Sequence, residues 1–415
     1  MEILANEFIK IEDGTAQGLS CYSPGICMGE DGRIVSTCEV SGNVKVLERN
    51  PGTCDRYGVL SQGRIYISDD KGKTFNKVHE FPFMHARPFR CGRRLYVLGH
   101  CADLMIIASD DNGMTWSAPS RLTDGEDWHQ APTNVHFEDG RVYIVMEKRK
   151  PMGITGWMVN NIAPVVMRGS VDCDLLNKDN WTFASELYFH EAVQKERLEY
   201  SGIPFFWTTP STYVEIAPGR ACAEIGWLET NIVRLHDERH YFHDKGTLHL
   251  FMRAHTGLTG YAAMAKVVEK DDGTMETMLE EVPSGRKIVY VPMPGGQMKF
   301  HILFDTVTEL YWLLSTQATD SMTRAELLPD DRYNLPDNER RRLVLHFSKN
   351  CFDWCFAGIV AEGRDEKMSR NYAAMEIDGD DLYIVSRSGD ENAKSAHDGN
   401  FISFHKIKQF RKLVY

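Results

Sequence analysis

Short apolar runs with period-two alternation dominate the chain, bounded by Gly, Asp and Asn, and long stretches with helical periodicity are nearly absent. One pattern recurs: a polar turn followed by a strand rich in β-branched and aromatic residues. Its copies are DGRIVSTCE from Asp31, CGRRLYVLGH from Cys91, DGRVYIVME from Asp139, KGTLHLFMR from Lys245, TELYWLLS from Thr308 and GDDLYIVSR from Gly379. Each copy follows another short strand and is predicted to be the second strand of a hairpin. Hairpins repeated in this way predict an all-β fold with radial blades, a β-propeller.

A second motif marks turns further along the predicted blades. The segments Ser68–Phe75 (SDDKGKTF) and Ser109–Trp116 (SDDNGMTW) both fit S-x-D-x-G-x-T-[WF] and start 41 residues apart. In such a turn the Asp side chain accepts hydrogen bonds from nearby backbone N–H groups, Gly supplies a positive φ, and the aromatic ring packs back between strands. Ser348–Trp354 resembles a shortened third copy, and Ser170–Trp181 could be a fourth, broken by an insertion.

Composition and charge exclude several classes of function. The chain has 415 residues, of which 26% are charged, and its net charge is −12. A length of this order predicts two or three domains at about 150 residues each, although closed all-β folds run longer as one unit. So acidic a protein is a poor partner for nucleic acid or for an anionic membrane. A small anionic ligand held by a local group of arginines remains compatible with it.

The ends and the cysteines give an expectation about compartment. The first residues, MEILANEFIKIEDG, lack the basic start and apolar run of a secretory signal, and no stretch approaches the roughly 18 apolar residues of a membrane span. The ten cysteines form no C-x-x-C pair. We therefore expect free thiols in a reducing cytoplasm. A secreted protein whose signal has been trimmed is the alternative.

The turn motifs resemble the Asp-box (BNR) repeats of the sialidase (neuraminidase) superfamily, whose fold is a six-bladed β-propeller. The resemblance implies that Phe8–Glu12 supplies the outer strand of the last blade and closes the ring beside Phe401–Ile407. It also implies one domain over residues 1–415, with an insertion at about 190–223 that fits no blade. No cofactor and no metal ion are expected.

Three segments resemble sialidase motifs residue by residue. NYAAMEIDGDDLYIVSR, from Asn371, resembles the last blade and places Tyr372 on the catalytic nucleophile. WLETNIVRLHD and LHLFMRAH resemble the stretch that carries the carboxylate activating that tyrosine and one arginine of the substrate-binding triad, which implies these roles for Glu229 and Arg253. RRLVLHFS resembles the segment of another triad arginine and implies Arg341, or Arg340 or Arg342 if the register slips.

The implied chemistry is coherent. A phenol has a pKa near 10 and needs a carboxylate within hydrogen-bond reach to act as a nucleophile at neutral pH. Sialidases use tyrosine in place of a carboxylate, since an anionic nucleophile would be repelled by a negative group on the anomeric carbon. Arginines bind the substrate carboxylate through two parallel hydrogen bonds, a geometry that lysine cannot reproduce.

The sequence also departs from the family. The first triad arginine is replaced by Tyr22 or Ser23 in CYSPGICMG, so Arg87 or Arg370 would have to reach in from a neighbouring blade. Asp55 is the positional candidate for the acid/base, and an ordinary turn residue is its alternative. Further residues predicted to line the funnel and bind substrate are His129, Gln130, Lys299 and His397.

The favoured function is that of a sialidase-like retaining exo-glycosidase that removes a terminal sugar, with an acidic one preferred, from a glycan. One alternative is a polysaccharide lyase in which His85 and His129 act with Tyr372 to abstract a proton next to a uronate carboxylate. The other is a glycan-binding propeller without catalysis, which the missing first arginine favours. The predicted partner in every case is a glycan, with no nucleic acid and no membrane.

Overall fold

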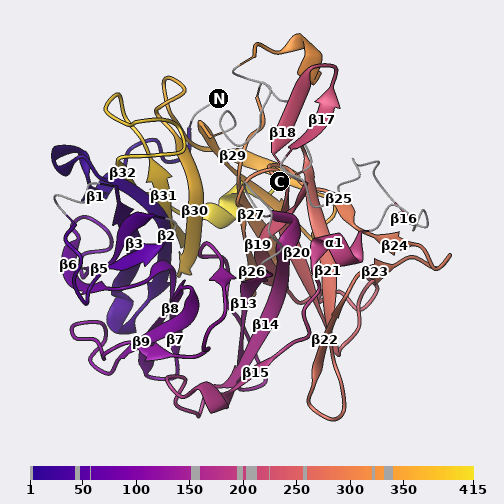
Figure 1. The fold of residues 1–415 in the computed structure, drawn as a ribbon, viewed down its shortest axis with the longest axis horizontal. Coiled ribbons are helices and arrows are strands. Elements are labelled where there is room, and N and C mark those ends of the chain that lie inside the picture. Colours follow the sequence, from indigo (N-terminus) through magenta and orange to yellow (C-terminus); the bar gives the residue numbers. More distant parts are fainter. Residues whose placement is uncertain are drawn as a thin grey trace.

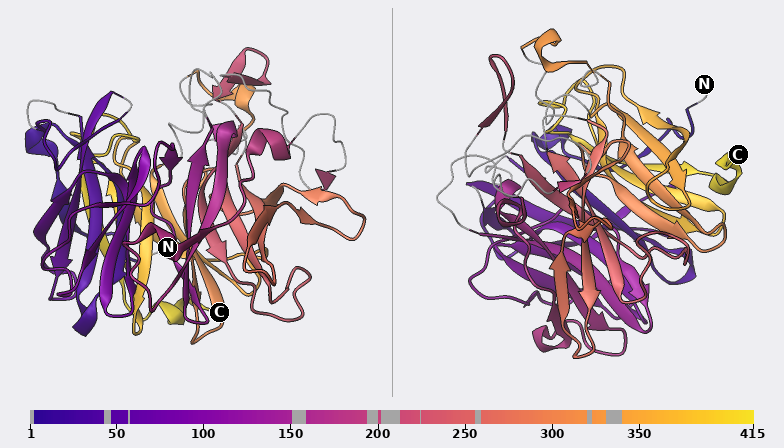
Figure 2. Two further views of the ribbon diagram at one scale, coloured as in Figure 1. Left: turned by 60° about the horizontal axis from the view of Figure 1, so that its bottom comes forward. Right: turned by 90° about the vertical axis from the view of Figure 1, so that its right-hand side faces the viewer.

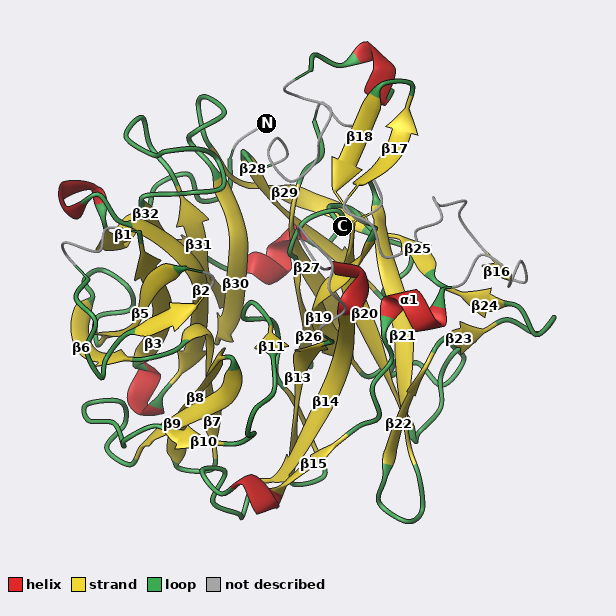
Figure 3. Cartoon of the chain, viewed as in Figure 1, coloured by secondary structure: helices red, strands yellow, loops and turns green. Residues whose placement is uncertain are grey.

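The computed structural model shows a ring of six β-sheets that follow one another in chain order (Figure 1). The prediction of a six-bladed β-propeller is therefore confirmed. The structure describes residues 3–42, 47–56, 58–150, 159–193, 200–201, 213–223, 225–255, 259–319, 323–330 and 340–415. Strands make up most of the ring and helices are short, as Figure 3 shows.

The first three blades are antiparallel sheets of consecutive strands. Blade 1 contains β2 (Ser20–Met28), β3 (Ile34–Ser41), β5 (Val59–Ser68) and β4 (Cys54–Arg56), with β6 (Asn76–Phe81) also paired to β5. Blade 2 contains β7 (Met84–Cys91), β8 (Arg94–Cys101), β9 (Asp103–Ser109) and β10 (Ser120–Arg121). In blade 3 the short strands β11 (Trp128–His129) and β12 (His136–Glu138) pair with β13 (Arg141–Arg149), which is followed by β14 (Ile162–Ser170) and β15 (Trp181–Phe183).

The other three blades follow the same plan. Blade 4 contains β19 (Gly226–Val233), β20 (Thr247–His255), β21 (Tyr261–Glu269) and β22 (Met275–Met278), with β25 (Tyr290–Pro292) also on β21. Blade 5 contains β26 (His301–Asp305), β27 (Leu310–Thr316), β28 (Arg342–Ser348) and β29 (Cys355–Glu362). Blade 6 contains β30 (Arg370–Asp378), β31 (Asp381–Ser388), β32 (Phe401–Ile407) and β1 (Ile9–Asp13).

The N-terminal strand closes the ring as predicted. Strand β1 pairs antiparallel with β32, and Ile9 lies opposite Phe404. The blades meet at the axis through their first strands: β2 contacts both β7 and β30, and β30 contacts β26. This arrangement directs the inner strand of each blade towards a common central channel.

The apolar core is divided among the interfaces between blades. Six of the clusters of buried side chains among the described residues each join two neighbouring blades. Between blades 3 and 4, Trp227 is fully buried, packs edge-on against Phe189 and donates from Nε1 to the carbonyl oxygen of Ile162 at 2.8 Å. Middle strands lie between two such clusters, so both of their faces are apolar, which explains the continuous hydrophobic runs in the sequence.

The two S-x-D-x-G-x-T turns share one hydrogen-bond pattern. The Asp70 carboxylate accepts bonds from the backbone N–H groups of Lys73 and Thr74, each at 2.9 Å, and from the Thr74 hydroxyl at 2.7 Å. Asp111 accepts in the same way from the backbone N–H and hydroxyl of Thr115, at 2.8 and 2.6 Å. The aspartate at the third position of each motif thus fixes the turn through local bonds.

One prediction about the cysteines is wrong. Cys54 and Cys101 form a disulfide that joins β4 of blade 1 to the end of β8 in blade 2. The two residues are 47 positions apart, and only the propeller brings their Cα atoms to 6.0 Å. Spacing along the chain could not show this, because the contact is made between blades.

Within the described residues, no helix is long and apolar enough to cross a membrane.

The described parts of the segment predicted as an insertion lie on one face of the ring (Figure 2). Its described parts are the short helix α1 (Phe189–Ala192), strand β16 (Tyr200–Ser201), which pairs with β24 (Lys287–Ile288), and the hairpin of β17 (Tyr213–Ala217) and β18 (Arg220–Ala223). Figure 2 shows α1 and the hairpin on the same side of the blades. The hairpin leads directly into β19, so this is the face at which β19 begins. Residues 194–199 and 202–212 of the predicted insertion lie outside the described part of the chain.

Candidate active site

A repeated backbone irregularity presents side chains to the funnel on this face. Strands β2, β7, β19 and β30 each contain a register shift near their start, and one residue of each shift has a left-handed backbone. These residues are Ser23 (φ 43°), His85 (φ 52°), Glu229 (φ 59°) and Tyr372 (φ 49°). Such a conformation is costly for a residue with a side chain and persists where the surroundings fix it, often at functional sites. In each of these four blades, a left-handed residue at a register shift therefore presents one side chain to the funnel.

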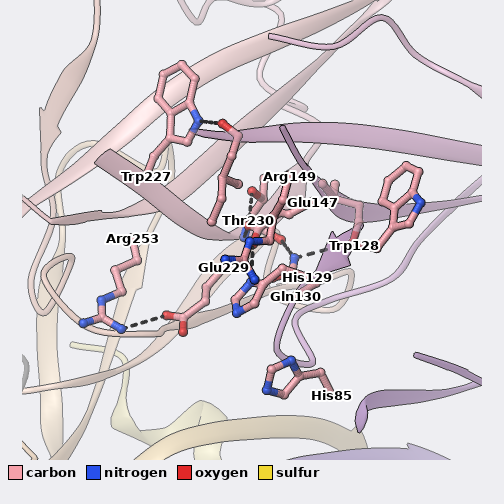
Figure 4. A network of polar contacts seen from close by, with 12 residues as sticks. His85, Trp128, His129, Gln130, Glu147, Arg149, Trp227, Glu229, Thr230 and Arg253 are labelled. Carbon is pink, nitrogen blue, oxygen red and sulfur yellow. Dashed lines mark hydrogen bonds and ion pairs between the residues drawn. The ribbon is translucent and has the colours of Figure 1, made fainter. Parts of the chain in front are cut away.

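Tyr372, Arg253 and Glu229 form one buried hydrogen-bonded group. Arg253 Nη1 donates to Tyr372 Oη at 2.8 Å and lies 3.4 Å from Glu229 Oε2. Arg253 and Glu229 are each 1% exposed, and Tyr372 is 8% exposed. Figure 4 shows the Glu229 carboxylate extended towards the Arg253 guanidinium. The structure thus brings together the three residues that the sequence assigns to nucleophile, base and carboxylate binding.

Two further arginines flank Tyr372. The Arg387 guanidinium lies 3.8 Å from the centre of the Tyr372 ring, and that of Arg340 lies 5.5 Å from it. Burial, followed by the charge of Glu229, raises the Tyr372 pKa, and the charges of the three arginines oppose this rise. Burial lowers the Arg340 pKa to about 10, with Arg387 and Arg253 acting in the same direction. Three guanidinium groups around one phenol make this part of the funnel strongly electropositive.

Three predicted arginines lie elsewhere. Arg341 is partly exposed and pairs with Glu362 at 3.2 Å, whereas its neighbour Arg340, the alternative left open by the sequence, faces Tyr372. Arg87 is buried and donates to Val145 O at 3.2 Å and to the Thr133 hydroxyl. It lines a cavity of about 240 Å³ formed by the inner strands beyond their register shifts, away from Tyr372.

Arg370 does not reach the Tyr372 group either. Its Nη1 donates to the carbonyl oxygens of Ser369 at 2.7 Å and Gly389 at 2.9 Å, and its guanidinium lies over the rings of Phe8 and Phe401. Arg370 therefore packs Phe8, the residue before β1, against the inner strands of blade 6. The third guanidinium at Tyr372 comes from Arg387 on β31.

Asp55 is poorly placed for the acid/base role that its position suggested. It lies on β4, is partly exposed and forms an ion pair with Arg49. None of its contacts within the described residues involves Tyr372, Glu229 or Arg253. The structure therefore favours the alternative of an ordinary residue in the hairpin.

The remaining predicted residues line the same funnel. Lys299 is buried and donates to Ala373 O at 2.5 Å, and burial lowers its pKa to about 7. Gln130 is fully buried and donates to Thr230 O at 3.1 Å. His397 forms part of the rim, where its Nδ1 lies 2.8 Å from Asp398 Oδ1 and its ring contacts Tyr22.

A cluster of three histidines lies beside this group. The ring centres of His85 and His129 are 5.1 Å apart, and those of His85 and His100 are 5.0 Å apart. Sequence reasoning missed His100 and the buried Glu147 that contacts His129, because both lie on second strands whose ends meet the funnel only in the folded ring. Among the described residues, no group of three or more His, Cys, Asp or Glu is arranged to hold a metal ion.

Glu39 on β3 contacts the backbone of His85, and burial raises the pKa of the Glu39 carboxyl to about 7. The backbone N–H of His85 donates to Glu39 Oε2 at 2.7 Å. The value in the unfolded chain is near 4.5, so the folded state holds a proton that the unfolded state has released. The stability associated with Glu39 is complete below pH 4.5 and is lost as the pH rises through 7.

Glu39→Gln keeps the hydrogen-bond acceptor and removes this titration. We expect the wild-type protein to lose about 2–3 kcal/mol more unfolding free energy than the variant between pH 5 and pH 8. Urea unfolding of both proteins at the two pH values measures the difference. An equal loss in the two proteins would contradict the assignment.

The ring has the six-bladed β-propeller fold that is also found in several solved glycosidase structures. An α-L-arabinanase of Penicillium chrysogenum complexed with arabinobiose superposes with a TM-score of 0.53 at 12% identity, over 98% of each chain. A GH93 α-L-arabinofuranosidase of Fusarium graminearum complexed with arabinobiose gives a TM-score of 0.53 at 8% identity, over 97% of this chain and 98% of the other. A Trypanosoma rangeli sialidase in complex with sialic acid gives 0.51 at 14% identity, over 95% of this chain and 55% of the other.

The likeness to these proteins is one of fold. No family model matches the sequence. No curated protein matches it either.

Proposed function

We propose that this protein is a retaining exo-glycosidase that removes a terminal acidic sugar from a glycan. Tyr372 is the nucleophile, and Glu229 takes the phenol proton. The observation that carries the proposal is the group of Tyr372, Arg253 and Glu229, in which a buried phenol hydroxyl lies 2.8 Å from a guanidinium that also contacts a carboxylate. A buried phenol in such a group is suited to covalent catalysis at an anomeric centre.

The proposed specificity for an acidic sugar rests on charge. Arg253, Arg340 and Arg387 surround Tyr372, and together they provide the paired N–H donors that bind a carboxylate. Blade 1 supplies Tyr22 in place of an arginine, and Arg387 of blade 6 lies over the Tyr22 ring at 4.8 Å. We propose that Arg387 replaces the missing leg of the carboxylate clamp from this different direction. The position of the substrate carboxylate is therefore expected to differ from that of a carboxylate bound by an arginine on β2.

The neighbouring structures support a glycan substrate, since they contain arabinobiose or sialic acid. We also propose that the ring and its insertion at about 190–223 form a single domain. The β17–β18 hairpin leads into β19, and Glu229 lies near the start of that strand, so the hairpin borders the entrance to the site. It is thus positioned to contact the part of the glycan beyond the terminal sugar.

A panel of 4-nitrophenyl glycosides tests the function. It contains sialic, glucuronic and galacturonic acids with neutral glucose, galactose and arabinofuranose as matched controls. We expect kcat/KM for one acidic sugar to exceed that of its neutral counterpart by at least about 100-fold, because only an acidic sugar presents a carboxylate to the three arginines. NMR of the first-formed sugar is expected to show retained anomeric configuration.

Three other outcomes would contradict the proposal. Equal turnover of acidic and neutral sugars would remove the role of the arginines. A product absorbing as an unsaturated uronate, formed from a uronate polymer, would indicate a lyase. Binding across the panel without any product would indicate a glycan-binding propeller.

A further inference from the structure

His129 and Glu147 form a pair that the proposed nucleophile and base do not use. Glu147 is fully buried on β13, and its Oε2 lies 3.1 Å from His129 Nδ1. Its other oxygen, Oε1, accepts bonds from the backbone N–H and hydroxyl of Thr230, at 3.0 and 2.9 Å. A carboxylate accepts from Nδ1, so Nδ1 of His129 carries hydrogen and Nε2 is left for other chemistry. His129 is 16% exposed in its side chain, so its ring is open to the funnel.

The other two histidines of the funnel, His85 and His100, are hydrogen-bonded to each other. Arg56 Nη1 lies 2.7 Å from His100 Nδ1, and since a guanidinium only donates, this nitrogen accepts. His100 therefore donates from Nε2 to His85 Nδ1 at 2.9 Å. His85 then carries its hydrogen on Nε2, which faces Glu39 Oε1 at 3.5 Å. Burial, reinforced by the charges of nearby groups, lowers the pKa values of His85 and His100 well below the usual range, so both rings are neutral.

The His129–Glu147 pair lies next to the Tyr372 group. Ala131, two residues after His129, packs in one buried cluster with Tyr372 and Met298. Thr230, which holds Glu147, follows Glu229 directly in the chain. Figure 4 shows Glu147 between His129 and Thr230. Glu229 and Arg253 lie to the left of these residues in the same view. The pair and the nucleophile thus share one funnel.

We propose that His129 is the general acid/base of this active site and that Glu147 is its positioning residue. The proposal rests on the glycosidase function proposed above. His129 would take the acid/base role, for which Asp55 is poorly placed because it lies on β4 and pairs with Arg49. A buried carboxylate that holds one imidazole nitrogen, directs the other at the substrate and stabilises the imidazolium is an established way to build an acid/base.

The steps balance with water as the co-reactant. Tyr372 Oη bonds to the anomeric carbon as the bond from that carbon to the leaving oxygen breaks. The phenol proton passes to Glu229, and the His129 imidazolium gives its Nε2 proton to the leaving oxygen. Water then bonds to the anomeric carbon and gives its proton to His129. The bond between the sugar and Tyr372 breaks, and the phenolate recovers its proton from Glu229.

Leaving-group dependence tests this role directly. For a methyl glycoside of the acidic sugar found in the panel, His129→Gln is expected to lower kcat/KM by about 10²–10⁴-fold, because methoxide must leave with a proton. For the dinitrophenyl glycoside the expected loss is less than about 10-fold, because dinitrophenolate leaves without one. Azide, which needs no base, is expected to accelerate the variant with the dinitrophenyl substrate and to form a glycosyl azide.

His136→Gln is the matched control. His136 lies in the same blade on β12, has the same 16% side-chain exposure and also faces a glutamate, Glu138 at 3.5 Å. This variant is expected to keep the wild-type ratio between the two substrates. A His129→Gln variant that loses activity equally on both substrates, or on neither, would overturn the proposal.

Glu147→Gln provides a second test that does not change His129. It is expected to move the alkaline limb of the kcat/KM profile for the methyl glycoside to lower pH, since the imidazolium loses its carboxylate. The groups around His129 are Glu147 on β13, the neutral rings of His85 and His100 on blade 2, and the charged Arg56 and Arg149, which lie close to those rings. An alkaline limb that stays in place would overturn the positioning role.

The two proposals fail differently. If Tyr372→Phe is inactive while His129→Gln shows no leaving-group effect, only the acid/base role is overturned. If the wild-type protein turns over none of the glycosides in the panel, both proposals are overturned. Circular dichroism and thermal unfolding of each variant exclude loss of the fold as the cause of lost activity.

Discussion

Tyr372→Phe is expected to lower kcat for an acidic aryl glycoside by at least about 10³-fold. The substitution removes the hydroxyl to which Arg253 donates and keeps the ring beneath Arg387, so substrate binding is expected to change little. Steady-state kinetics with the 4-nitrophenyl glycoside measure kcat. Calorimetric titration with the free sugar measures affinity.

Tyr22→Phe is the matched control for this prediction. Its ring also lies beneath Arg387, at 4.8 Å, and its hydroxyl donates to Asp398 at 2.7 Å at the rim. We expect it to keep kcat within about 10-fold of wild type, because a rim hydroxyl takes no part in bond breaking. Comparable losses in the two variants, or retained turnover in Tyr372→Phe, would contradict the assignment of the nucleophile.

Arg253→Met is expected to lower the free energy of unfolding by about 3–5 kcal/mol and to abolish turnover. Burial alone would lower the Arg253 pKa, but Tyr372 and Glu229 outweigh it and raise the value, so the guanidinium is charged in the core. Removing it leaves the Glu229 carboxylate buried at 1% exposure without its charge partner. Urea unfolding at pH 7 measures the loss.

A second substitution and a surface control complete the experiment. Adding Glu229→Gln to Arg253→Met removes the uncompensated charge and is expected to restore part of the stability, so the two effects are not additive. Arg342→Met breaks a partly exposed pair with Glu362 and is expected to cost less than about 1 kcal/mol. Additive losses in the double variant would show that Arg253 and Glu229 are not coupled.

The fold could be predicted because its signals are local. Alternation along a strand and the hydrogen bonds of Asp70 and Asp111 within their own turns depend on residues a few positions apart. Tyr372, Glu229 and Arg253 could be placed for a related reason, since each lies in a short motif on a strand. Their meeting at 2.8 and 3.4 Å follows from the closure of the ring.

Other parts of the site depend on information that the sequence does not carry. Arg340, Arg341 and Arg342 are consecutive, and in extended backbone a shift of one residue turns a side chain to the opposite face. Choosing Arg340 therefore requires the register of the strand. The left-handed backbone of residues such as His85 and Glu229 at the register shifts could not be predicted either, because neither residue type is characteristic of that conformation.

The pairing of β1 with β32 also governs the order of assembly. Strand β1 leaves the ribosome before the other described strands, and its partner β32 leaves after them, with Ile9 opposite Phe404. Until β32 is synthesised, β1 has no ladder to join, and the last blade lacks its outer strand. Contacts so distant in sequence are slow to form, because loop closure costs entropy before the contact stabilises the chain. Blades 1 to 5 can therefore associate during translation as an open arc, and the funnel takes its final shape once β32 has been synthesised.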